Sequence, residues 1–193
     1  TLLLAVLPLA SQAAVLDDDR IDILYQQYDG GGTKVEAPAI VVRKKLAESV
    51  AISGSYLVDM VSGASIDVEV GASAYEEERT EYSVGLQYLH EKAILNLGYS
   101  QSKENDYLAK SYQIGISQDF FGDLTTLSMG LSFGDNEISQ TGAPNFLETA
   151  QSYSMDLGLT QVITRNFIGQ LSLNKTIDEG YLQNPYRFIR YLA

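Results

Sequence analysis

Apolar and polar residues alternate along most of the chain with a period of two. This is the pattern of β-strands whose two faces meet different surroundings. The clearest run spans residues 82–89 and reads Tyr, Ser, Val, Gly, Leu, Gln, Tyr, Leu. Apolar residues with helical spacing do not persist for more than two turns. The pattern predicts an all-β fold, an antiparallel up-and-down meander of about nine strands. The expected ranges are 20–28, 35–46, 49–60, 82–89, 93–100, 111–117, 125–134, 153–160 and 167–174.

The polar face of the six clearest strands carries almost no charge. Of its 21 polar positions between Ser83 and Asn174, only Asp156 is charged, and the others are Ser, Thr, Gly, Gln or Asn. A strand face in bulk water usually carries Lys, Glu and Arg. Small uncharged polar residues suit the crowded interior of a closed barrel, and the opposite face then meets lipid, where an Arg or Lys costs roughly 2–4 kcal/mol at the midplane. The chemistry of the two faces predicts part of a transmembrane β-barrel.

Connection lengths predict the same arrangement, because barrels of this kind have short periplasmic turns and longer outer loops. We expect short inner turns at Leu46–Ser49, His90–Lys92, Asp119–Asp123 and Ile163–Asn166. We expect longer outer loops at Ser62–Glu77, Gln101–Asp106 and Asp135–Gln151, and a modest one at Asp29–Thr33. These loops would hold most of the acidic residues, among them Glu76, Glu77, Glu78, Glu104, Asp106, Asp135 and Glu137.

Aromatic residues are expected in two belts at the membrane interfaces. The outer belt would contain Tyr82, Tyr99, Tyr112, Phe133 and Tyr153, and the inner one Tyr88, Phe120, Phe121 and Phe167. The alternative is that these rings pack in the core of a soluble β-sandwich.

The first residues predict export. An apolar run ends in small residues at Ser11 and Ala13, so we expect cleavage between Ala13 and Ala14. Residues 1–13 would then be an N-terminally clipped signal peptide and residues 14–193 a partial outer-membrane barrel domain. A short transmembrane anchor is the alternative, but the run is short and contains Pro8.

Charge and cysteine content narrow the classes of function. The net charge of −12 argues against a nucleic-acid partner, which requires clustered Lys and Arg. Without cysteine the chain can form neither a disulfide nor a thiolate metal site. We expect no cofactor and no metal.

Several stretches occur together in a recognisable order. They are Val42–Lys45, Tyr56–Val68, Glu77–Ser83, Ser117–Ser128 and Asp178–Arg187. Over about residues 20–191 the chain resembles the uncharacterised outer-membrane family designated domain of unknown function 3570. Members of that family are about twice as long, so the resemblance implies that C-terminal strands are missing here and that the barrel is incomplete. An odd number of strands agrees with this, because bacterial single-chain barrels have even counts. The resemblance implies no reaction and no ligand.

Some residues are candidates for a role in the barrel interior. The possible lumen-lining residues are Asp156, Arg43, Gln87, Asn96, Gln113, Gln170 and Asn174. Asp156 must be solvated or paired, for example with Arg43, and it would either tune ion selectivity or act as a structural partner. The possible functional loop contains Asp178, Glu179, Gly180, Asn184, Pro185 and Arg187, and it would fold against the lumen or bind a partner.

Other motifs are expected to have no chemical role. His90 is the single histidine and lies in an expected inner turn, so we expect no catalysis by it. Asp17, Asp18 and Asp19 lack the spacing of a calcium loop and are expected to form a solvated linker. Gly30–Gly32 lacks the Lys-Ser or Lys-Thr of a phosphate loop and is expected to connect two strands.

The sequence therefore predicts an outer-membrane β-barrel protein of a Gram-negative bacterium that is not an enzyme. We expect a passive channel or a platform for envelope assembly, in contact with the lipid bilayer and with periplasmic or surface proteins. Two alternatives stay open: a secreted soluble β-sandwich adhesin, and a barrel enzyme whose active site lies in the missing half.

Overall fold

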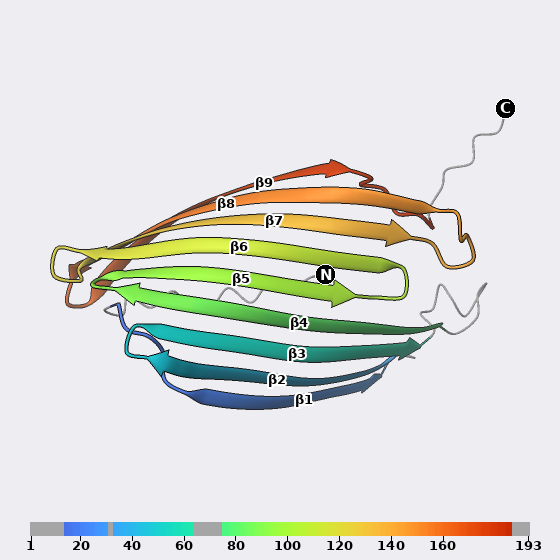
Figure 1. Cartoon of the computed structure of the whole chain (residues 1–193), viewed down its shortest axis with the longest axis horizontal. Helices are drawn as coiled ribbons and strands as arrows, with labels where there is room; N and C mark the ends of the chain where they lie inside the picture. The colour runs from blue at the N-terminus through green and yellow to red at the C-terminus, as the bar shows by residue number, and fades with distance from the viewer. Residues whose placement is uncertain (1–13, 31–32, 64–74, 187–193) are drawn as a thin grey trace.

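The computed structural model of the chain describes residues 14–30, 33–63 and 75–186. These residues form one sheet of nine strands in which every strand pairs antiparallel with its neighbours in sequence (Figure 1). The strands are β1 Arg20–Gly30, β2 Thr33–Ala47, β3 Val50–Gly63, β4 Tyr75–His90, β5 Ala93–Lys103, β6 Tyr107–Phe120, β7 Thr125–Ser139, β8 Leu147–Thr164 and β9 Phe167–Gly180. The predicted all-β meander of nine strands is confirmed, and the sheet is not closed.

The inner turns are short, as predicted, and span residues 48–49, 91–92, 121–124 and 165–166. The strands, however, extend farther at the outer end than predicted. The connection between β5 and β6 is only 104–106, and that between β7 and β8 is 140–146. Residues 64–74 of the predicted loop between β3 and β4 lie outside the described part of the chain.

The prediction that most acidic residues lie in outer loops was therefore wrong. Glu78 lies in β4, and Asp135 and Glu137 lie in β7, where they oppose Gln151 and Thr149 of β8. Backbone hydrogen bonding continues past the point where apolar alternation stops, because the pairing does not depend on which residues face outward. Sequence periodicity marks the apolar band of each strand and not its full length.

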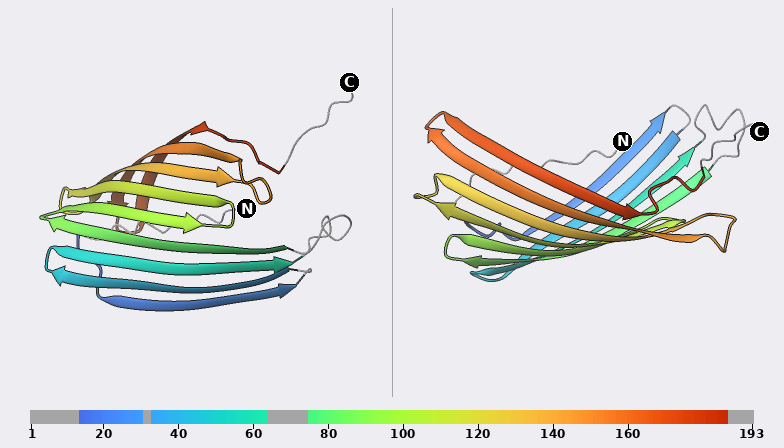
Figure 2. Two further views of the ribbon diagram at one scale, coloured as in Figure 1. Left: turned by 45° about the vertical axis from the view of Figure 1, so that its right-hand side comes forward. Right: turned by 90° about the horizontal axis from the view of Figure 1, so that it is seen from above.

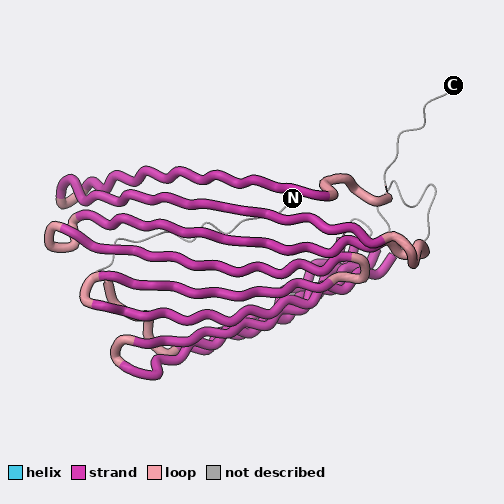
Figure 3. Tube along the Cα trace, turned by 45° about the horizontal axis from the view of Figure 1, so that its top comes forward, coloured by secondary structure: helices cyan, strands magenta, loops and turns pink. Residues whose placement is uncertain are grey.

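Neither face of the sheet is covered by a second layer of described residues. Seen from above, the sheet is strongly curved, with β1–β3 and β8–β9 forming two arms (Figure 2, right). Figure 3 shows loops only at the two ends of the strands and no helix. No helix among the described residues is long and apolar enough to cross a membrane.

Burial in this sheet is the reverse of that in a soluble protein. In β4, Tyr82, Val84, Leu86 and Tyr88 are exposed, whereas the serine, glycine and glutamine between them are half-buried. The buried apolar residues of the described chain are only Leu16, Ala51, Ile138 and Ala150, and no large described side chain is less than 2% exposed. A water-soluble domain of this length buries a large apolar core. The described residues have none, and their apolar face is open to the surroundings.

The outer aromatic residues form a continuous row across the apolar face. Ring centroids are 6.1 Å apart for Tyr82 and Tyr99, 5.2 Å for Tyr99 and Tyr112, 6.3 Å for Tyr112 and Phe133, and 5.2 Å for Phe133 and Tyr153. The row crosses β4 to β8 as predicted, but it lies inside the strands rather than at their ends. This position suits rings at a membrane interface, with the strands continuing into water beyond it.

The strands are staggered in a regular way. The row of paired residues that begins at Arg20, the first residue of β1, passes through Gly98 of β5 and ends at Thr176 of β9. Thr176 lies nine residues after Phe167, the first residue of β9. With about 3.3 Å per residue and about 4.8 Å between strands, this stagger gives a strand tilt of about 38°. Strands in β-barrels tilt by about 35–45°. The register has irregularities only between Lys45 and Ala47 and between Val162 and Thr164.

Candidate functional site

The candidate site is the polar face of the sheet. Residues directly opposite one another in paired strands point to the same side, so the register assigns each side chain to a face. One row on the polar face runs through Lys45, Ala51, Gln87, Asn96, Gly115, Gly130, Asp156 and Asn174. The structure places all seven predicted lumen-lining residues on this face, since the neighbouring rows contain Arg43, Gln113 and Gln170.

Glycine and serine are frequent on this face because the strands bring their side chains close together. A Cβ at Gly85 would lie 2.6 Å from Ser53 Oγ, and one at Gly158 would lie closer still to Ser128 Oγ. Amide side chains fill the wider gaps, and Gln87 Nε2 donates to Asn96 Oδ1 at 3.0 Å. This crowding is expected on the inside of a curved sheet.

A groove of about 680 Å³ follows the middle of the polar face. Its two charged lining residues, Glu81 and Asp156, are both acidic. Asp156 Oδ1 accepts a hydrogen bond from Asn174 Nδ2 at 2.5 Å, and the facing residue on β7 is Gly130, which leaves the space above the carboxylate open. The proposed pairing of Asp156 with Arg43 was wrong, because Arg43 Nη1 lies 2.7 Å from Asp17 Oδ2. Asp156 thus presents a carboxylate to the groove with only a neutral amide as partner.

The polar face also carries charges near its ends that sequence reasoning missed. Toward the outer end, Arg79 Nη2 lies 3.6 Å from Asp59 Oδ2, and Asp59 Oδ1 and Arg79 Nε are buried without a hydrogen-bond partner. At the inner end, Asp119 is 5% exposed and accepts a 2.6 Å hydrogen bond from Thr126 Oγ1. Arg79 and Asp119 fell beyond the predicted strand ends, whereas Asp59 lies inside the predicted range 49–60. The parity of each position relative to Ser55, Ser83 or Ser117 could have assigned all three residues to this face.

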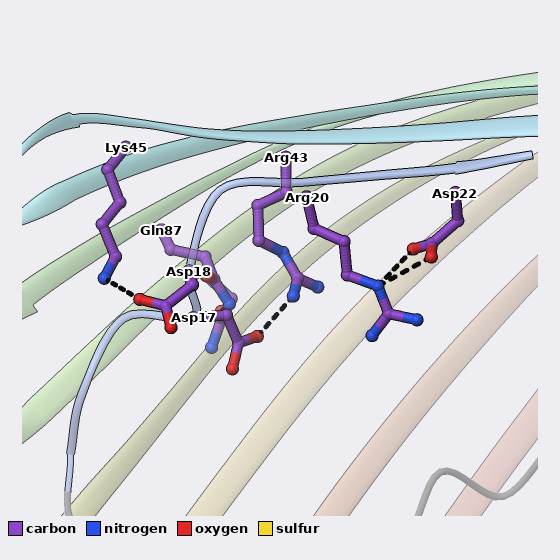
Figure 4. A network of polar contacts seen from close by, with 8 residues as sticks. Asp17, Asp18, Arg20, Asp22, Arg43, Lys45 and Gln87 are labelled. Atoms are coloured by element: carbon purple, nitrogen blue, oxygen red, sulfur yellow. Dashed lines mark hydrogen bonds and ion pairs between the residues drawn. The ribbon is translucent and has the colours of Figure 1, made fainter.

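The segment that precedes β1 is bound to β2. Asp17 pairs with Arg43, and Asp18 Oδ1 lies 2.8 Å from Lys45 Nζ (Figure 4). Asp19 accepts hydrogen bonds from Lys44 Nζ and, at 2.7 Å, from the Lys45 backbone N–H. The three carboxylates are exposed, as predicted for a solvated linker, but the prediction did not include their pairing with β2. β2 extends beyond β1, whose first residue Arg20 pairs with Arg43, and the linker takes the place of a strand partner there. The hydrogen bonds from Lys44 and Lys45 hold the pKa of the Asp19 carboxyl below its ordinary value of 3.8.

The predicted functional loop is part strand and part return segment. Asp178, Glu179 and Gly180 are the last residues of β9, so their assignment to a loop was wrong; they pair with β8. Residues 181–186, which include Asn184 and Pro185, fold back toward the outer loops, and Arg187 lies outside the described residues.

This return segment is fixed at several points. Tyr186 Oη donates to Asp106, and the Thr141 N–H donates to Tyr186 Oη at 2.9 Å. Gln140 Nε2 donates to the Pro185 carbonyl at 3.3 Å, and the Tyr181 ring meets Phe146 edge-on at 5.5 Å. Together with Tyr107, Asn136 and Ser152 the segment lines a hollow of about 840 Å³ at the outer end of the polar face. The segment therefore bridges the β5–β6 and β7–β8 connections.

The other motifs occupy peripheral places. His90 is the last residue of β4 rather than part of the turn, and its ring stacks on Tyr88 at a centroid distance of 6.3 Å. Gly30 ends β1, and the two glycines after it lie outside the described part, as does the predicted signal peptide. The described residues contain no cluster of three His, Asp or Glu that could hold a metal ion.

Comparisons with known proteins give a family and a distant likeness to solved structures. The family model described as "Protein of unknown function (DUF3570)" matches residues 68–193. Of the stretches that carry the resemblance, Val42–Lys45 and most of Tyr56–Val68 precede the matched region. A search of curated proteins gives no match.

Among solved structures, OccAB3 of Acinetobacter baumannii aligns with 13% sequence identity and a TM-score of 0.45. The alignment covers 82% of this chain and 55% of that one, so this chain spans about half the length of OccAB3.

Proposed function

This chain belongs to the DUF3570 family of proteins of unknown function, and we propose that it forms part of an outer-membrane β-barrel that acts as a passive channel. The observation that carries this proposal is the reversed burial of the sheet. Its apolar face is open, with Leu131 47% exposed, whereas the polar face is crowded and carries few charges over its middle, Asp156 among them. A sheet of this kind is stable when hydrocarbon covers the apolar face and water fills the enclosed side.

The regular stagger supports closure into a barrel, because a sheet with this tilt curves onto itself when more strands follow. Within the part of the chain that the structure describes, β1 and β9 are the unpaired edges of the sheet, and they support closure as well, since unpaired strand edges invite further pairing. In the proposed arrangement the inner turns lie in the periplasm and residues 1–13 serve as a cleaved signal peptide. We further propose that the full protein has no catalytic activity.

Single cysteines test the membrane arrangement directly, because the chain has none of its own. Leu131→Cys and Ser132→Cys are neighbours on β7 that point to opposite faces. In the full-length protein in lipid vesicles, a membrane-impermeant maleimide should label the Ser132→Cys variant and leave the Leu131→Cys variant unlabelled. A secreted sandwich would leave Leu131→Cys unlabelled without any lipid, so the proposal also requires that the protein sediment with the vesicles. Equal labelling of both variants in vesicles would refute it.

Asp156 is expected to favour cations in the channel. Its carboxylate has no cationic partner among the described residues and lines the groove together with Glu81. Asp156→Asn keeps the shape and removes the charge, so the cation-to-anion permeability ratio in planar bilayers should fall. Asp135→Asn is the matched control, since it removes the same charge from a β7 position that points to the other face. An unchanged ratio in Asp156→Asn, or an equal fall in the control, would exclude this role.

A further inference from the structure

We propose that residues Ala14–Asp19 form a releasable lid, which docks on the polar face at the inner end of β2 and narrows the channel there. The inference rests on the proposed function, because a lid of this kind needs an interior to narrow. Its basis is the contact of three consecutive carboxylates with three consecutive basic residues of β2, Arg43, Lys44 and Lys45.

The path of the segment follows from which face each basic residue uses. Arg43 and Lys45 point to the polar face, because their β3 partners are Ser53 and Ala51, whereas Lys44 lies opposite Ile52 and points to the apolar face. Asp19 contacts Lys44 and the Lys45 backbone, so it lies at the free edge of β2. Asp18 and Asp17 then pair with the polar-face residues (Figure 4). The chain therefore turns from the strand edge toward the interior.

The low exposed fractions of Leu16 and Ala51 indicate where the segment meets the sheet. Leu16 is 3% exposed, although it precedes the first strand, and Ala51 is 1% exposed. Ala51 lies on the polar face opposite Lys45, the residue that pairs with Asp18. Other residues therefore cover Leu16, and the pairs of Asp17 with Arg43 and of Asp18 with Lys45 place it over this part of the polar face.

The ion pairs that hold the segment are exposed to water and can be broken. The Asp18 side chain is 98% exposed and that of Asp17 is half-exposed, and ion pairs in contact with water contribute little and are screened by salt. A segment needed only to begin the sheet would require Asp19 alone, because that residue satisfies the free backbone edge of β2. The ion pairs of Asp17 and Asp18 and the buried Leu16 instead fix the position of the segment, and they contribute nothing to strand pairing in the sheet.

Docking is tested by the accessibility of a cysteine at the anchor. In the full-length protein, Leu16→Cys should react slowly with a water-soluble maleimide at low salt. Adding Asp17→Asn and Asp18→Asn to Leu16→Cys should make labelling roughly tenfold faster. High salt should raise the labelling rate of Leu16→Cys alone by a similar factor, and it should leave the rate of the triple variant unchanged. Asp22→Asn is the control, since its carboxylate pairs with Arg20 on the same face and takes no part in docking. Labelling that is equally fast in all backgrounds overturns the proposal.

Exchanging the charges of Asp17 and Arg43 tests whether faster labelling reflects the loss of their ion pair or only a loosening of the segment by the introduced cysteine. Asp17→Arg alone should speed labelling, and its combination with Arg43→Asp should restore protection; failure of the restoration also overturns the ion-pair mechanism. In planar bilayers the Asp17→Asn, Asp18→Asn variant should conduct more than the parent at low salt. An increase in labelling without any change in conductance overturns the narrowing role, whereas the absence of conductance in both proteins refutes the proposed function instead.

Discussion

Replacing Met129 with arginine should cost the protein about 2–4 kcal/mol of folding free energy in a bilayer, the typical cost of a cation on the lipid face at the midplane. Met129 lies on the apolar face of β7, opposite Ile116 on one side and Leu157 on the other. It is 46% exposed, and it lies four positions before Phe133 of the outer aromatic row. The size of the loss depends on what covers this face, because arginine on a face in water would cost almost nothing.

Ser132→Arg is the matched variant for this experiment. It adds the same side chain to the same strand, but its residue points to the polar face. Both variants are folded into lipid vesicles, and the folded fraction is followed against urea by the electrophoretic mobility of unheated samples. The expected result is a large loss for Met129→Arg and a small one for Ser132→Arg. Equal losses would show that the two faces do not differ in environment.

Replacing Gly180 with alanine should release the return segment at the outer end. Gly180 has a φ of +103°, and a Cβ there would collide with the Thr149 carbonyl oxygen and lie 3.0 Å from Ala150 Cα. Backbone strain of this kind costs about 1–3 kcal/mol, and the collision with backbone atoms adds to it. The Tyr181 N–H, which donates to the Thr149 carbonyl at 2.9 Å, should then exchange with deuterium roughly tenfold to a hundredfold faster.

Gly142→Ala separates strain from collision. Gly142 also has a positive φ, of +86°, but nothing lies within 4 Å of the position of a Cβ. It lies in the β7–β8 connection that the return segment contacts through Thr141. We expect Gly142→Ala to change exchange at Tyr181 much less than Gly180→Ala. Similar effects of the two substitutions would mean that the close approach of Gly180 to β8 does not hold the segment.

The strand count and the division of faces could be predicted from the sequence because both follow from local alternation. Tyr82, Val84 and Leu86 define an apolar face without any knowledge of their partners, and the pairing of consecutive strands then follows from short turns such as residues 91–92. The ends of strands could not be predicted in this way. Beyond Tyr153 both faces of β8 are polar, so the pairing of Gln151 and Thr149 left no periodic signal.

Contacts between segments distant in sequence were the other part that could not be predicted. The sequence shows Asp17–Asp19 and Arg43–Lys45 as two unconnected charge runs. Their pairing depends on how far β2 extends beyond the first residue of β1. The candidate partner for Asp156 was wrong for the same reason. Arg43 pairs instead with Asp17, which lies 26 positions earlier in the sequence and which the register of β1 and β2 brings close to it. Tyr186 and Asp106, 80 positions apart, give no hint of their hydrogen bond.

The unbroken register from β3 to β8 limits how the length of this chain can change. Because side chains alternate, one residue inserted into a central strand would exchange the faces of every position between the insertion and the next turn, and would turn serines to lipid and leucines to water. The two irregularities lie beside inner turns, where a strand ends and few positions remain to be inverted. Insertions and deletions should therefore be tolerated near the turns and loops but not within the strands. The strands keep a fixed length and register, while the loops are free to vary.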